Sequence, residues 1–116
     1  MKKSVLVIDD ENDLCKLVSI VLNKDGFQVS CAHNLAEAKQ KLHERPDIVL
    51  LDNNLPDGTG LDFLQTHPSN FTESYVIMIS ADPGKELQKK ASDEGIQNFL
   101  SKPFSMVRMR EILKAV

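Results

Sequence analysis

Residues 4–26 read SVLVIDDENDLCKLVSIVLNKDG, a short apolar run followed by a cluster of acids and a long amphipathic stretch. The apolar run ends at Ile8 and is almost continuous, as is typical of a strand buried on both faces of a parallel sheet. The amphipathic stretch has the apolar spacing of one helix face, carried by Leu14, Leu17, Val18, Val21 and Leu22. Gly26 follows, where helices commonly end in a left-handed residue. This segment predicts a strand followed by a helix.

The same alternation of apolar run and amphipathic stretch occurs five times along the chain. The predicted strands are residues 4–8, 27–31, 47–51, 75–79 and 98–100. Such alternation predicts an α/β fold with one doubly wound, five-stranded parallel sheet and five helices. No linker or repeat interrupts the pattern, so we expect a single domain.

Two of the predicted helices carry distinctive signals. Asn34 and Glu37 have the spacing of a capping box and predict the start of the second helix. The fourth helix, expected near residues 84–94, has Leu87 and Ala91 as nearly its only apolar side chains. We therefore expect this helix to be loosely held.

The composition is that of an ordinary globular domain. The 116 residues are 41% hydrophobic and 27% charged, and the net charge is −3. We see no basic stripe of the kind that binds nucleic acid, no apolar run long enough to span a membrane and no signal peptide. Cys15 and Cys31 have no metal-binding spacing and are expected to be reduced thiols. We expect a cytoplasmic protein that contacts neither membrane nor nucleic acid through this domain.

Polar residues follow four of the predicted strands. Asp9 and Asp10 follow the first strand, Asp52 the third, Ser80 the fourth and Lys102 the fifth. The carboxyl ends of parallel strands share one edge of the sheet, where open α/β folds place their binding sites. Clustered carboxylates repel each other by about 4 kcal/mol per pair at 4 Å and an effective dielectric of 20. The cluster therefore predicts a bound cation.

Each of these residues also has a structural explanation when it is taken alone. Acids after strands often cap the next helix or form turns, a serine there commonly bonds the backbone, and a lysine is usually solvated. Four such coincidences at one sheet edge are a poorer explanation than one site. Carboxylates suit Mg²⁺, and a carboxylate beside a metal and a lysine can attack phosphorus.

The chain resembles the receiver domain of two-component response regulators, the CheY-like superfamily, over essentially its full length. The motifs that carry the resemblance are VIDDE (7–11), LDNNLPDGTG (51–60), ISA (79–81) and LSKPF (100–104). Single motifs are weak signals, but all four in this order are specific. The resemblance implies a flavodoxin-like sheet with strand order 2-1-3-4-5.

The resemblance also implies roles for the site residues. Asp52 would accept a phosphoryl group from the phosphohistidine of a sensor histidine kinase or phosphotransfer protein. Asp10 and the backbone carbonyl of Asn54 would bind Mg²⁺ together with Asp52, and Asp9 would act through a bound water. Lys102 would contact the phosphoryl group.

Further residues are implied in switching and dephosphorylation. Ser80 would be the switch hydroxyl and Phe99 the switch aromatic, although a core role for Phe99 beside Leu100 remains equally open. Asn54 and Asp82 would flank the phosphoryl group and modulate its loss. The peptide bond before Pro103 is expected to be cis.

These roles describe a phosphorylation-dependent switch rather than an enzyme that turns over a substrate. Residues 1–116 would be the N-terminal receiver domain of a longer response regulator, and the face of strand 4, helix 4 and strand 5 would control an output domain or partner. A homodimer through helix 4, strand 5 and helix 5 is a further expectation. The alternatives are a small Mg²⁺-dependent phosphatase with an aspartate nucleophile, which would need an acid where Asn54 stands, and an inactive docking module, against which the intact acid pair argues.

Overall fold

The fold is built on one parallel sheet. The computed structural model describes residues 2–81, 84–96 and 98–116. The main strands are β1 (Ser4–Ile8), β2 (Gln28–Ala32), β3 (Ile48–Asp52), β6 (Tyr75–Ser80) and β7 (Asn98–Ser101). They pair in parallel in the order β2-β1-β3-β6-β7. Counted along the chain, this is the expected order 2-1-3-4-5 of a flavodoxin-like sheet.

A second, very small sheet lies beyond the end of β3. It is the antiparallel hairpin of β4 (Asn54–Leu55) and β5 (Gly58–Thr59). The alternating pattern of the sequence did not predict this hairpin, because each of its strands is only two residues long.

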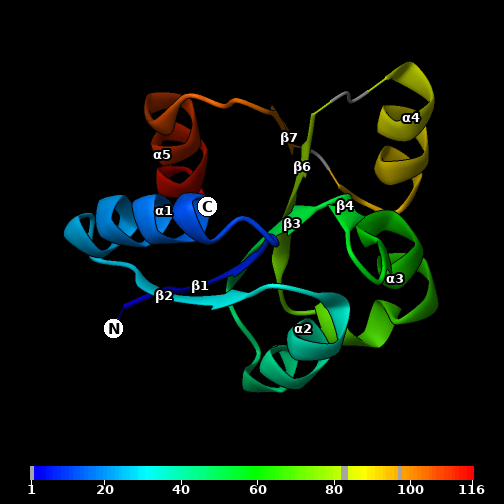
Figure 1. Ribbon diagram of the computed structural model, residues 1–116, viewed down its shortest axis with the longest axis horizontal. Coiled ribbons are helices and arrows are strands. Elements are labelled where there is room, and N and C mark those ends of the chain that lie inside the picture. The colour runs from blue at the N-terminus through cyan, green and yellow to red at the C-terminus, as the bar shows by residue number, and fades with distance from the viewer. Residues whose placement is uncertain (1, 82–83, 97) are drawn as a thin grey trace.

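Five helices cover both faces of the main sheet. They are α1 (Asn12–Lys24), α2 (Leu35–Lys41), α3 (Gly60–Thr66), α4 (Lys85–Asp93) and α5 (Met106–Lys114), with short 3₁₀ turns η1 (Leu42–Glu44) and η2 (Pro68–Phe71). Helices α1 and α5 pack on one face, and α2, α3 and α4 lie on the other (Figure 1). The prediction of a doubly wound α/β domain with five helices is confirmed.

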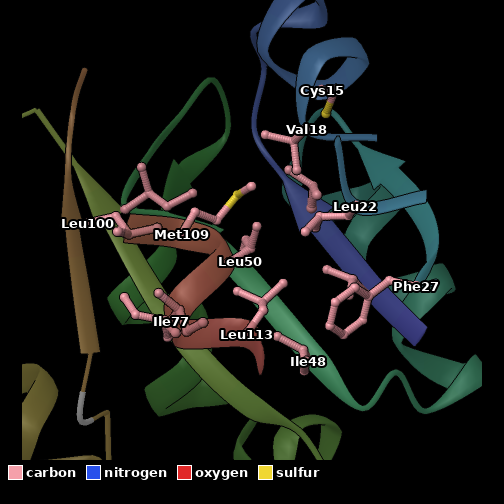
Figure 2. Packing of buried hydrophobic residues seen from close by; sticks show 14 residues of the cluster. Cys15, Val18, Leu22, Phe27, Ile48, Leu50, Ile77, Leu100, Met109 and Leu113 are labelled. Carbon is pink, nitrogen blue, oxygen red and sulfur yellow. The ribbon is translucent and has the colours of Figure 1, made fainter. Parts of the chain in front are cut away.

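The side-chain alternation of the strands divides the core into two clusters. In β1, Val5 and Val7 contact the cluster under α1 and α5, whereas Leu6 and Ile8 contact the cluster under the other helices. Figure 2 shows the first cluster, in which side chains of α1 and α5 pack over the strands. Because both faces are covered, the central strands read as continuous apolar runs.

The sequence signals for two helix ends, at Gly26 and Asn34, agree with the structure. Gly26 has φ +90°, and the N–H groups of Gly26 and Phe27 donate to the carbonyls of Asn23 (3.1 Å) and Leu22 (3.0 Å), which is the bonding pattern of a Schellman cap. At α2, the Asn34 side chain accepts from the Glu37 N–H at 2.8 Å. Each glycine or asparagine signal therefore marks a real helix end.

The strands β2, β3, β6 and β7 each end one residue later than the sequence predicts, and in β3 and β6 the added residue belongs to the predicted site. Asp52 and Ser80 are the last residues of β3 and β6, not the first residues after those strands. The ladder continues through them because Asp52 pairs with Ile79 and Ser80 pairs with Ser101 of β7. Both side chains are consequently buried, with exposed fractions of 2% and 3%.

Candidate functional site

Three carboxylates meet at the carboxyl edge of the main sheet. Asp9 and Asp10 follow β1, and Asp52 ends β3. One oxygen from each side chain lies within 4.8 Å of the other two. Asp9 is completely buried and Asp10 is exposed, so the cluster opens to solvent on one side.

Lys102, the residue after the edge strand β7, brings a positive charge into this cluster. Its Nζ lies 2.9 Å from Asp9 Oδ2, 3.0 Å from Asp52 Oδ2 and 3.2 Å from Glu11 Oε2. Its own N–H donates to the Ser80 carbonyl at 2.9 Å, which holds the start of the loop after β7 against the end of β6. The bond between Lys102 and Pro103 is cis, the isomer that the resemblance implies. One ammonium thus contacts three carboxylates, two from the segment after β1 and one from the end of the neighbouring strand β3.

The two oxygens of Asp9 have different partners. Oδ1 accepts the Glu11 N–H at 2.9 Å. Oδ2 is buried, has the Lys102 ammonium beside it as an ion pair, and makes no hydrogen bond of acceptable geometry within the described part of the chain. A buried carboxylate oxygen normally finds such a partner. Asp9 Oδ2 therefore has acceptor capacity left for a cation or for a water bound to one.

Asp52 is held through both of its oxygens. Oδ1 accepts the Asn54 N–H at 3.0 Å, and Oδ2 contacts Lys102. Burial raises the pKa of Asp52, with a further contribution from the charge of Asp9, whereas the Asn54 N–H and Lys102 act in the opposite direction. Burial alone would lower the pKa of Lys102, but its contacts with Asp9 and Asp52 raise that pKa above its usual range.

The two pKa shifts have opposite meanings for the ion pair between Lys102 and Asp52. The raised pKa of Lys102 means that its charged form is stabilised, whereas the raised pKa of Asp52 means that its charged form is destabilised. Burial is the main cause of the raised pKa of Asp52, and repulsion by the Asp9 carboxylate adds to it. Asp9, Asp10, Glu11 and Asp52 bring four carboxylates to the single ammonium of Lys102. We expect Lys102 to stay charged, and the site to remain short of positive charge. An oxygen-ligated divalent cation such as Mg²⁺ fits this donor set.

The two candidate switch residues lie on neighbouring strands. Ser80 is buried at the end of β6. Phe99 is partly buried in β7 and packs against the cluster under α2, α3 and α4, whereas Leu100 packs under α1 and α5. Phe99 and Leu100 therefore face opposite sides of the sheet. Phe99 is thus in contact with the core, which is compatible with either role considered for it.

The two candidate modulators of dephosphorylation differ in what can be said of them. Asn54 begins β4 two residues after Asp52 and is exposed. Asp82 lies outside the described residues.

Three further residues make contacts in or near the site that the sequence did not predict. Glu11 is the residue before α1, a position where an acid often caps the helix. Its carboxylate makes no capping hydrogen bond and contacts Lys102 instead. Asp57 accepts backbone N–H groups of α2. A Cβ at Gly60 would lie 2.6 Å from the Asp52 backbone oxygen, so only glycine fits behind Asp52. All three stand inside the quoted motifs, but their partners depend on the tertiary fold.

Comparison with known proteins identifies the family. The model of the response regulator receiver domain matches residues 5–114. The response regulator protein PilR of Pseudomonas aeruginosa is 34% identical over 113 residues, which are 97% of this chain and 25% of PilR. The phosphate regulon transcriptional regulatory protein PhoB of Escherichia coli is 32% identical over 119 residues, which cover 100% of this chain and 52% of PhoB. The chain thus spans about half, or less, of these two relatives.

A solved structure supports the same assignment. The beryllofluoride-activated NtrC4 receiver domain dimer is 34% identical and has a TM-score of 0.88, with 97% of this chain and 93% of that chain covered. Among the described residues, no helix is both long and apolar enough to cross a membrane. The sheet order, the acidic edge with its lysine and the family match lead to one conclusion: the chain belongs to the response regulator receiver domain family.

Proposed function

We propose that this domain is a phosphorylation-dependent switch in which Asp52 accepts a phosphoryl group from a phosphohistidine. The donor would be a sensor histidine kinase or a phosphotransfer protein in the cytoplasm. The observation that carries the proposal is the Asp52 carboxylate itself, which is buried at the sheet edge with the Asn54 N–H on one oxygen and Lys102 on the other. A carboxylate held so firmly is oriented for attack before the donor arrives.

The proposed transfer is a simple exchange of bonds at phosphorus. An Asp52 carboxylate oxygen forms the new P–O bond, the P–N bond to the phosphohistidine breaks, and its electron pair goes to the imidazole nitrogen. Lys102 is close enough to Asp52 Oδ2, at 3.0 Å, to neutralise charge on the phosphoryl oxygens as they arrive.

A magnesium ion, when bound, would supply further positive charge for the same oxygens. Asp10, Asp52 and the Asn54 backbone carbonyl would hold it, and Asp9 would hold one of its waters through Oδ2. The support for this ligand set is the excess of carboxylates over ammonium groups and the unused acceptor on Asp9.

The switch would begin with the new charge on Asp52. A phosphoryl group adds about −1.5 to −2 charges and strong acceptor oxygens at pH 7. Ser80 would bond one of these oxygens, and the face of β6, α4 and β7, including Phe99, would adjust. Reversing a two-state equilibrium from 1:99 to 99:1 requires about 5.5 kcal/mol of differential binding. Helix α4 suits such a change because Ala91 is its one fully buried residue.

Two kinds of partner follow from this proposal. Exposed Leu17 (47%) and Ile20 (56%) on α1, the helix that follows the acidic loop, offer apolar contacts to a phosphoryl donor. The switching face would act on an output domain beyond residue 116 or on a second copy through α4, β7 and α5. The related NtrC4 receiver forms a dimer in its activated state, which supports the second possibility.

The phosphatase alternative has no support in the site. It requires a general acid or base two residues after Asp52, and that residue is Asn54, whose amide does not exchange protons in this way. The docking-module alternative does not explain why four carboxylates and a lysine converge. We therefore propose no catalysis beyond the domain's own phosphotransfer and dephosphorylation.

The decisive experiment is labelling by a small phosphodonor. Acetyl phosphate with MgCl₂ should add one phosphoryl group to the wild-type chain, and Asp52→Asn should abolish the addition, as read by intact-protein mass spectrometry. Asp62→Asn, which changes an exposed carboxylate on α3, is the matched control and should label normally. Equal labelling of Asp52→Asn and wild type would overturn the proposal.

A further inference from the structure

The β4–β5 hairpin is attached to the start of α2 by one side chain. Asp57, at the turn of the hairpin, accepts the Leu35 N–H on Oδ1 at 2.9 Å and the Ala36 N–H on Oδ2 at 3.2 Å. The hairpin also lies close against the Leu35 side chain, since a Cβ added at Gly58 would be only 3.1 Å from Leu35 Cδ1. The hairpin therefore rests on α2 through polar and apolar contacts together.

The other end of the same hairpin belongs to the site. Asn54 begins β4, pairs with Thr59 of β5 and donates its N–H to Asp52 Oδ1 at 3.0 Å. Isolated two-stranded hairpins are at best marginally stable, and this one has two residues per strand. Its position must therefore come from what it touches, and Asp57 provides its hydrogen bonds to α2.

We propose that Asp57 is a positioning residue for the metal site. By fixing the hairpin to α2, it holds the backbone of Asn54, whose carbonyl is in the proposed Mg²⁺ ligand set. Within the described part of the chain, the hydrogen bonds of the Asp57 side chain go only to the backbone N–H groups of Leu35 and Ala36, and the proposal gives Asp57 no part as a metal ligand or phosphoacceptor. The inference rests on the proposed function, because it concerns the metal of that function.

Helix α2 supplies a matched control for this proposal. The first N–H groups of a helix have no partners within the helix. At α2, Asp57 satisfies those of Leu35 and Ala36, and Asn34 satisfies that of Glu37. Asp57→Ala and Asn34→Ala thus remove caps from the same helix end. Only Asp57→Ala also removes the hydrogen bonds that tie the turn of the hairpin to α2.

The test is a titration of the ¹⁵N-labelled chain with MgCl₂, followed by the amide signals of Asn54 and Glu11. Asp57→Ala should weaken Mg²⁺ binding about tenfold, the low end for residues that orient metal ligands. Asn34→Ala should bind as wild type does, although both variants lose thermal stability. Asp57→Asn keeps one acceptor oxygen and should fall between them.

A second readout needs no metal. Without MgCl₂, hydrogen exchange at the Asn54 amide should be faster in Asp57→Ala than in wild type, and unchanged in Asn34→Ala. The inference is overturned if Mg²⁺ binds wild type but Asp57→Ala and Asn34→Ala have equal affinities, because Asp57 would then be only a helix cap. Absence of any MgCl₂ response in wild type would instead overturn the metal in the proposed function, and the inference with it.

Discussion

At the scale of single residues, Lys102 stands out because its ammonium pairs with three carboxylates. Its side chain is 18% exposed and lies between Asp9 and Asp52, whose side chains are 0% and 3% exposed. Two buried carboxylates therefore depend on one ammonium for compensation. Loss of one partner from a buried ion pair is costly because the remaining charge stays buried.

Lys102→Ala should therefore destabilise the domain strongly. We expect the free energy of unfolding at pH 7 to fall by about 3 kcal/mol, the lower end for broken buried pairs. Added MgCl₂ should recover part of this loss, because a bound cation compensates the same carboxylates. Urea denaturation with and without MgCl₂ measures both effects. Lys89→Ala, on the exposed side of α4, should change little, and similar losses in the two variants would contradict the argument.

At the residue scale, the sequence predicts some contacts of the site and not others. Asp9, Asp52 and Lys102 could be brought together from the sequence, because the ends of parallel strands must share an edge. Glu11 and Asp57 could not be assigned, because their partners belong to distant segments, and the direction of each side chain is set only when those segments pack. Edge geometry is thus predictable from strand pattern, whereas contacts of loop side chains are not.

At the scale of elements, α1 and α4 are opposites. Helix α1 buries Cys15, Val18 and Leu22, while α4 buries only Ala91 completely and Leu87 partly. The sequence showed this contrast, since apolar periodicity decides how much of a helix face can be covered. It did not show the β4–β5 hairpin, because strands of two residues are too short to produce an alternating pattern.

Helix α4 should accordingly open more readily than α1. Regions with few buried apolar contacts have low local opening free energies. In native-state hydrogen exchange at neutral pH, amides of residues 88–93 should exchange faster than those of residues 16–24. Protection of α4 equal to that of α1 would contradict a loosely held helix and weaken its proposed part in switching.

At the scale of the whole molecule, an ion pair between residues far apart in the sequence joins α1 and α5, the two helices on one face of the sheet. Arg110 of α5 donates from Nε and Nη2 to the two oxygens of Asp25, the C-cap residue directly after α1, both at 2.8 Å. These hydrogen bonds hold the pKa of Asp25 below its ordinary value of 3.8. The bidentate arrangement links the ends of two helices that also share a hydrophobic cluster.

Stability should depend on pH through this pair. Because the folded pKa of Asp25 is lowered, its contribution is fully present above 3.8 and is lost as pH falls through the lower folded value. Asp25→Asn should therefore be less stable than wild type at pH 7, and the difference should shrink in acid. Urea denaturation at pH 7 and at several acidic values tests this. A difference that is independent of pH would show that the charge of Asp25 is not responsible.

The division of the core by the sheet has a consequence for genetics. Residues under α1 and α5 contact a different set of neighbours from those under α2, α3 and α4, and Phe99 belongs to the second set. Random substitutions should consequently fall into two phenotypic groups. Damage under α1 and α5 should reduce the amount of protein in the cell, whereas damage under the other three helices should also alter how strongly each surviving molecule signals. A screen that scores protein abundance and signalling response separately should then assign each core residue to one face of the sheet from its mutant phenotype.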